Sequence, residues 1–300
     1  MKFSVEQWQP EYGVPAGPDL PAAVPPVDLS VEVPPRGWGP IRPDAEAVES
    51  VLFADGVRRV DASVWIEVDQ GSRLGLCASY AAGAVLCRAD SAEIVGCRVE
   101  RGLFTAVSDA QAISTRHARY PVRPTPGESP EELWLGIQNR MADLEAEVGL
   151  DVEADLVVVD GPLSHHRALP RAVGYVKTQH VRYLPDELTP VLAGLPVGRR
   201  TPLFLVGGPR SGFSWYVRIG SGGGSLGGLA RCEITADREV AEAARLADRV
   251  TATLPRFASK EHKDPRAPQN LYPVGGLERV LRHRLGDQSV LYRSLRAAAI

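Results

Sequence analysis

Two aspartates stand where buried β-strands are expected to end, and a pair of such carboxylates could hold a metal ion. The stretch ADLVVVDGPL, residues 154–163, runs from four apolar residues into Asp160, and Gly-Pro then ends the run. A short unbroken apolar run is typical of a strand buried on both faces, and open α/β sheets bind ligands at the C-terminal edge of such strands. Upstream, the apolar residues 51–54 run into Asp55 and a glycine in the same way. The alternative is that each Asp-Gly pair is only a turn.

Chemistry on a phosphodiester would need a third carboxylate, which we expect from a helix before the second strand. Mg²⁺ and Mn²⁺ prefer oxygen ligands, and two ions about 4 Å apart can stabilise both the attacking and the leaving oxygen. Ser129 as N-cap, Pro130 at the first helical position and apolar residues at 3/4 spacing predict a helix over residues 130–148.

The C-terminal half of this helix offers three candidate acidic side chains. Asp143 and Glu147 share one face, whereas Glu145 lies about 160° away from either. We favour Glu145 as the third ligand because it follows Met141, on the expected buried side, by four residues. The alternative is that any of these acids simply belongs to a solvated helix face.

Three other features near the second aspartate could take part in chemistry. Lys177, at the end of the predicted strand VGYVKT (173–178), could contact a scissile phosphate or extend to the surface. His165 and His166 could bind a metal, or form an exposed loop pair. The stretch GSGGGSLGG (220–228) lacks the Gly-Lys-Ser/Thr of a phosphate loop, so we interpret it as a mobile turn. A motor that hydrolyses ATP would therefore be a separate protein.

The composition indicates a cytoplasmic protein that does not cross a membrane. The 300 residues carry a formal net charge of −3, and no apolar run approaches the roughly 18 residues that span a bilayer. The N-terminus lacks the apolar segment of a secretory signal. Four scattered cysteines without a CxxC pair predict reduced thiols rather than a zinc site or a disulfide scaffold.

The chain is expected to consist of an N-terminal arm and one large domain. Residues 1–43 contain ten prolines and predict an extended arm, with Trp8, Tyr12 and Trp38 as aromatic anchors. Residues 44–300 form the domain. Its predicted strands are 51–55, 59–67, 73–80, 83–88, 93–100, 155–160, 173–178, 201–206, 213–219 and 229–234, and its later helices are one capped by Asp237 and running to about 253, 276–286 and 288–298.

Four segments, in this order, resemble the NurA nuclease family. They are FADGVRRVDA, ADLVVVDGPL, VGYVKT and the late NLYP before a final helix. The resemblance covers roughly residues 50–285. It implies an α/β fold, a ribonuclease H-like mixed sheet flanked by helices. It also implies a homodimer that cuts DNA with Mn²⁺ (or Mg²⁺) in DNA end resection, together with HerA, a hexameric ATPase.

The resemblance also implies roles for individual residues. Asp55 and Asp160 match the strand-borne metal ligands, and Tyr272 matches the tyrosine of the C-terminal motif. The family often has DGS at the first site, where this chain has DGV. It also pairs the tyrosine with a histidine two helical turns later, where this chain has Val280; His283 lies one turn further on.

Charge is distributed unevenly along the chain. The first 50 residues carry three basic and eight acidic side chains, and the last 50 carry nine basic and four acidic ones. The C-terminal segment, with Arg279, Arg282 and Arg284, could bind DNA phosphates or form an ordinary solvated helix face.

Three functions fit these observations. The first is a metal-dependent DNA nuclease, which the two intact aspartates favour. The second is a non-catalytic adaptor on the same fold that binds DNA or an ATPase, which the valine at position 280 favours. The third is an unrelated nucleotide- or sugar-binding α/β enzyme, against which the absence of a Rossmann fingerprint counts.

Overall fold

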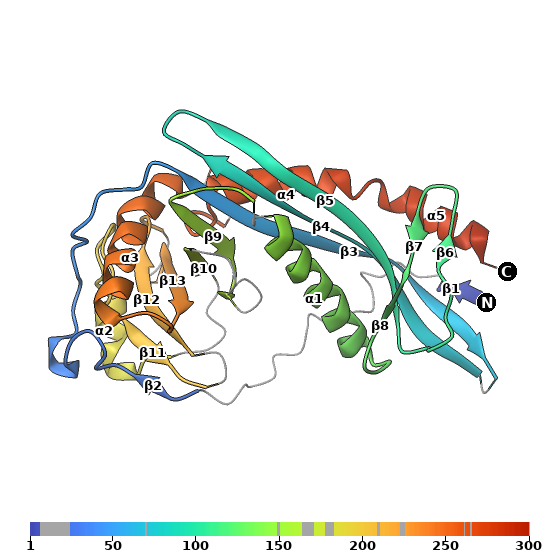
Figure 1. Cartoon of the computed structure of the whole chain (residues 1–300), viewed down its shortest axis with the longest axis horizontal. Coiled ribbons are helices and arrows are strands. Elements are labelled where there is room, and N and C mark those ends of the chain that lie inside the picture. The colour runs from blue at the N-terminus through green and yellow to red at the C-terminus, as the bar shows by residue number, and fades with distance from the viewer. Residues whose placement is uncertain are drawn as a thin grey trace.

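A large mixed β-sheet with helices on both faces forms the protein (Figure 1). The computed structural model describes residues 1–6, 25–69, 71–148, 151–163, 171–177, 183–208, 211–222, 226–260, 262–264 and 266–299. The strands are β1 (Phe3–Val5), β2 (Val27–Asp28), β3 (Val51–Val68), β4 (Gly71–Cys87), β5 (Ala92–Thr105), β6 (Ile113–Ser114), β7 (Arg119–Tyr120), β8 (Val122–Pro124), β9 (Leu156–Asp160), β10 (Ala172–Val176), β11 (Phe204–Val206), β12 (Gly212–Arg218) and β13 (Leu229–Thr235). The helices are α1 (Pro130–Val148), α2 (Thr189–Ala193), α3 (Val240–Thr253), α4 (Tyr272–Arg284) and α5 (Gln288–Ala298), with 3-10 turns at Pro35–Gly37, Asp186–Leu188 and Leu254–Phe257.

Within the described residues, the main sheet has eleven strands in the order β2-β11-β12-β13-β10-β9-β3-β4-β5-β8, and β1 pairs with β3. The central strands β3, β9 and β10 are parallel, and β4 and β13 pair antiparallel on either side of them. This mixed sheet is the architecture that the sequence predicts. The long strands β3, β4 and β5 cross most of the molecule, and the shorter strands β9 to β13 lie at one end (Figure 1).

The predicted breaks after the first aspartate are wrong. Residues 51–55 and 59–67 belong to the single strand β3, and 73–80 and 83–88 belong to the single strand β4. The Asp55-Gly56 pair is not a turn, because both residues are paired across to Gly83 and Ala82 of β4. Asp55 therefore lies inside a long strand, whereas Asp160 ends its strand as predicted.

Alternating side chains of β3 contact helices on opposite faces of the sheet. Phe53 and Val57 belong to the same hydrophobic cluster as the buried leucines of α4, whereas Val60 packs in a second cluster with the apolar stripe of α1. A β-bulge between Val60 and Ala62 shifts this alternation, so that Ala62 and the residues beyond it pack in a third cluster with α5. Helices α4 and α5 thus cover one face and α1 covers the other.

Helix boundaries follow the capping signals in α1 but not in α3 and α4. Ser129 and Glu132 hydrogen-bond each other reciprocally at the start of α1, which confirms the predicted helix 130–148. Asp237 does not cap α3, since its side chain interacts with Thr235 and the helix begins at residue 240. Helix α4 begins at Tyr272, four residues before the predicted start.

The described parts of the N-terminal arm are packed on the domain. Strand β1 extends the sheet beside β3, and β2 pairs with β11. Trp38 is buried, stands near the ring of Phe204 and donates its indole N–H to the carbonyl of Leu29. The other two anchors, Trp8 and Tyr12, lie outside the described residues.

The four cysteines are free thiols, and three of them are buried. Among the described residues, no helix is both long and apolar enough to cross a membrane.

Candidate metal centre

The parallel pairing of β3 with β9 brings the two aspartates together. Ala54 lies opposite Val159 in the register, so the next residues along both strands are Asp55 and Asp160. Neighbouring residues in register on parallel strands project to the same face of a sheet. Both carboxylates therefore project to the face that α4 covers, next to the hydrophobic cluster that includes Val158.

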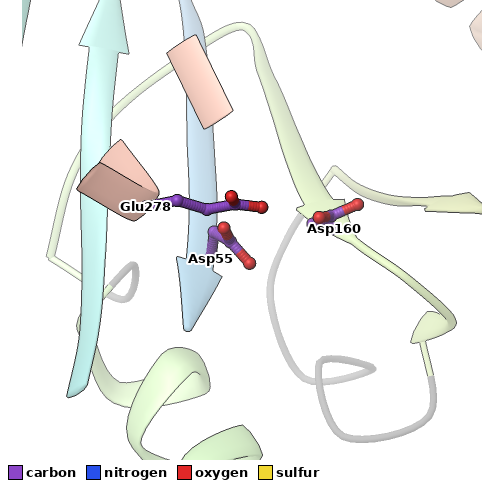
Figure 2. Close-up of side chains that lie close together, drawn as sticks. All are labelled: Asp55, Asp160 and Glu278. Atoms are coloured by element: carbon purple, nitrogen blue, oxygen red, sulfur yellow. The ribbon is translucent and has the colours of Figure 1, made fainter. Parts of the chain in front are cut away.

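Helix α4 supplies a third carboxylate, from Glu278. The apolar residues Val274, Leu277 and Leu281 fix α4 against the sheet, and Glu278 follows Leu277 at the edge of this buried stripe. Oxygen atoms of Asp55, Asp160 and Glu278 all lie within 4.8 Å of one another. Figure 2 shows the three side chains pointing toward one another from β3, β9 and α4.

Burial and mutual repulsion destabilise the ionised form of these carboxylates. Burial, followed by the negative charges of Asp160, Glu145 and Glu278, raises the pKa of Asp55 well above its usual value. Burial also raises the pKa of Asp160, although the positive charge of Lys177 opposes that rise. These shifts mean that the three carboxylates repel one another when they are ionised.

The same residues fit a divalent metal ion. Asp55 Oδ1 accepts a hydrogen bond from the backbone N–H of Gly56, but Oδ2 is buried without any hydrogen-bond partner among the described residues. A buried, unpartnered carboxylate oxygen beside two more carboxylates offers the all-oxygen ligand set that Mg²⁺ and Mn²⁺ prefer. A bound cation would satisfy that oxygen and remove the mutual repulsion.

Each of the other two carboxylates has a basic partner. Lys177 Nζ lies 2.5 Å from Asp160 Oδ2, so this lysine contacts the centre rather than extending into solvent. Arg266 binds Glu278 through two hydrogen bonds, with Nη1 3.1 Å from Oε1 and Nη2 2.9 Å from Oε2. These contacts orient both carboxylates toward Asp55.

Glu145 approaches the centre from α1, on the opposite face of the sheet. It is 5% exposed, and its carboxylate lies against the backbone of Gly56, where any Cβ would collide with it. The glycine is therefore required for this close approach rather than for a turn. Glu145 is not in the three-carboxylate group, but its charge acts on Asp55. Its role as a metal ligand stays a prediction.

Tyr272 and His283 lie at the two ends of α4, six residues before and five residues after Glu278. Tyr272 is the first residue of the helix, and its ring centroid lies 5.4 Å from Lys263 Nζ. His283 is exposed in the last turn. Within the described residues, no hydrogen bond or ion pair joins either residue to Asp55 or Asp160, and their catalytic roles also stay predictions. His165 and His166 lie outside the described residues.

Glu278 is not among the residues predicted from the sequence, although the sequence contains a signal for it. Glu278 is the one acidic residue in the segment 272–284, which otherwise carries three arginines and a histidine, and it directly follows an apolar residue of the buried stripe. A lone acid beside the buried stripe of a basic helix indicates a specific partner.

The fold is similar to that of a solved nuclease. No family model and no curated protein sequence matches this chain. The crystal structure of the NurA nuclease from Sulfolobus solfataricus matches with a TM-score of 0.51 at 12% identity, over 83% of this chain and 84% of that one. Weaker matches are endonuclease V from Bacillus subtilis (TM-score 0.36, 13% identity, 85% and 86% covered) and the catalytic domain of human endonuclease V (0.36, 16%, 84% and 92%). The NurA match confirms the fold implied by the sequence resemblance.

Proposed function

We propose that this chain is a metal-dependent DNA nuclease that hydrolyses phosphodiester bonds with Mn²⁺ or Mg²⁺. The observation that carries the proposal is the convergence of Asp55, Asp160 and Glu278, with one buried carboxylate oxygen unpartnered. The similarity to the NurA fold supports it, because the two strand-borne aspartates stand on adjacent parallel strands of that fold.

Each residue at the centre has a distinct part in this proposal. Asp55, Asp160 and Glu278 would hold the ion, with Glu145 as a further ligand from α1. A bound divalent ion would activate a water molecule and stabilise the oxygen that leaves the phosphate. Lys177 offsets the charge of Asp160 and stands close enough to the carboxylates to contact a phosphate of the substrate.

The proposed partners come from the family resemblance. They are DNA, a HerA-type hexameric ATPase that moves DNA to the nuclease, and a second copy of this chain in a homodimer, all in the cytoplasm and in the context of DNA end resection. Size-exclusion chromatography with light scattering, on the full chain alone and mixed with such an ATPase, tests both assemblies.

The second candidate is an adaptor that binds DNA or the ATPase without cutting. Two observations favour it: the valine at position 280, and the exposure of His283. An adaptor would bind DNA with or without metal and would leave it intact.

A cleavage assay separates these two functions. Purified chain is incubated with end-labelled single- and double-stranded DNA in Mn²⁺, in Mg²⁺ or in EDTA, with and without a HerA-type ATPase. We expect cleavage in Mn²⁺ or Mg²⁺ and none in EDTA, because negatively charged carboxylates alone cannot stabilise the negative charge that develops on the leaving oxygen. Asp55→Asn protein purified in parallel controls for contaminating nucleases. DNA that is bound but stays intact under every condition would support the adaptor instead.

The exposed arginines of α4 are expected to bind the DNA backbone. Arg279, Arg282 and Arg284 are exposed, and they follow Glu278 along the helix. Replacing all three with glutamine should weaken DNA binding and reduce the salt dependence, by about 0.9 in the slope of log K against log salt for each lost phosphate contact. Fluorescence anisotropy at several salt concentrations measures this slope. The double variant Arg245→Gln, Arg249→Gln on α3 is the control. If the slope were the same in both variants, the three α4 arginines would not contact DNA phosphates.

A further inference from the structure

A continuous chain of hydrogen bonds joins two of the three carboxylates behind the centre. It begins at Asp160, whose Oδ2 accepts a hydrogen bond from Lys177 Nζ. The same lysine nitrogen donates to Asn270 Oδ1 at 2.9 Å. Asn270 is fully buried and stands just before α4.

The chain continues from Asn270 to the third carboxylate. Asn270 Nδ2 donates to Asp264 Oδ2 at 2.5 Å. Asp264 in turn interacts with Arg266 through the backbone N–H at 2.8 Å and the guanidinium at 3.4 Å. The guanidinium of Arg266 then binds both oxygens of Glu278.

The middle connection requires a side chain that both accepts and donates a hydrogen bond. Lys177 requires an acceptor and the Asp264 carboxylate requires a donor, and the asparagine presents one of each. An aspartate at this position would face another carboxylate, and an apolar residue would break the connection, leaving Lys177 bonded only to Asp160 and Asp264 only to Arg266. The hydrogen bond from Tyr175 Oη to the carbonyl of Gln269, at 2.7 Å, holds this loop against β10.

We propose that Asn270 is a positioning residue that fixes Asp160 and Glu278 relative to each other through Lys177 on one side and Asp264 and Arg266 on the other. The proposal deepens and rests on the proposed function, because the two carboxylates it positions are those that would bind the metal. Two carboxylates that repel each other will separate unless their partners are held in place. Groups behind the ligands commonly set metal affinity in this way.

The glycines of α4 provide a matched pair of variants. A Cβ added at Gly275 would lie 3.0 Å from Asn270 Nδ2 and 3.4 Å from Asp264 Oδ2, so it must displace the asparagine amide by a few tenths of an ångström. A Cβ added at Gly276 would meet nothing within 4 Å. Alanine is favoured over glycine in a helix, so neither substitution should unfold the protein.

Mn²⁺ affinity of the full chain, measured by titration calorimetry without DNA, tests the proposal. We expect Gly275→Ala to bind Mn²⁺ more weakly than the wild type, and Gly276→Ala to bind like the wild type. Asn270→Leu, which changes no charge and keeps the branched shape of the side chain, should weaken Mn²⁺ binding by about 10- to 100-fold. Thermal unfolding of each variant shows that the loss of affinity does not come from loss of folded protein.

The outcomes distinguish this proposal from the one on which it rests. If the wild type binds Mn²⁺ and Asp160→Asn does not, the metal centre stands. Wild-type affinity in Gly275→Ala would then overturn the role of Asn270 alone, even if Asn270→Leu failed to fold. If the wild type itself does not bind Mn²⁺, the metal centre and the role of Asn270 are overturned together.

Discussion

Replacing Asp55 or Asp160 with asparagine is expected to abolish metal-dependent DNA cleavage while the protein stays folded. Each substitution keeps the shape of the side chain but removes one ligand charge, and the ion that remains is held weakly and out of place. One misplaced group in a catalytic centre costs about a hundredfold in rate. Initial cleavage rates at saturating Mn²⁺ measure the loss. Near wild-type cleavage by either variant would show that these aspartates do not hold the catalytic metal.

The same substitution at Asp55 is expected to make the metal-free protein more stable. Burial and the neighbouring carboxylates raise the pKa of Asp55 in the folded state, so ionisation near pH 7 favours the unfolded state. An asparagine stays neutral and does not carry this cost. Stability gained on removing a functional group is a known trade-off at strained sites.

Thermal unfolding in EDTA tests this second effect. The melting temperature of Asp55→Asn should exceed that of the wild type at pH 7, and the difference should shrink as the pH falls and the wild-type carboxyl becomes protonated. Asp69→Asn, at an exposed position after β3, is the control and should change neither stability nor cleavage. A lower melting temperature for Asp55→Asn at pH 7 would contradict the repulsion described above.

Replacing Arg200 with methionine is expected to cost about 3–5 kcal/mol in the free energy of unfolding, the cost of removing one partner from a buried ion pair. The side chain of Arg200 is 2% exposed. Its guanidinium binds both oxygens of Glu32, at 2.7 and 2.9 Å, and Asp248 of α3 at 2.6 Å. Methionine would fill the space but leave two carboxylates facing each other with no cation between them.

Urea unfolding followed by circular dichroism measures this cost. Arg245→Met, the same exchange at an exposed position on α3, is the matched control and should stay within about 0.5 kcal/mol of the wild type. Because Glu32 lies in the N-terminal arm, limited proteolysis of Arg200→Met should also cut the arm sooner. If the loss of stability matched that of the control, the contacts of Arg200 with Glu32 and Asp248 would not hold the arm to the domain.

How much of the structure could be predicted depends on how local its causes are. The start of α1 follows from a capping serine, a proline and a glutamate within four residues, and these signals act without the rest of the protein. The end of β9 follows in the same way from the Gly-Pro after Asp160. The nature of the centre, two carboxylates on neighbouring strands, could be anticipated because parallel strands place equivalent positions side by side.

The errors occur where a distant partner decides the outcome. Asp55-Gly56 has the composition of a turn, but pairing with β4 continues the strand, and the glycine gives space to Glu145 from α1. Glu278 and Asn270 could not be assigned to the centre, because their contacts lie on strands far earlier in the sequence. Helical periodicity shows which side of α4 is buried, but not which strand it covers.

The spacing of the three carboxylates along the chain has a consequence for the time at which the centre forms during synthesis. The hairpin of β3 and β4 joins neighbouring segments and can fold early, so Asp55 is placed on its strand first. Asp160 follows only when β9 pairs beside β3, and Glu278 only when α4, near the end of the chain, has emerged and docked. A growing chain therefore carries an incomplete set of these carboxylates until α4 docks. For a protein proposed to cut DNA, this order of assembly would keep the unfinished polypeptide inert until its last helices are in place.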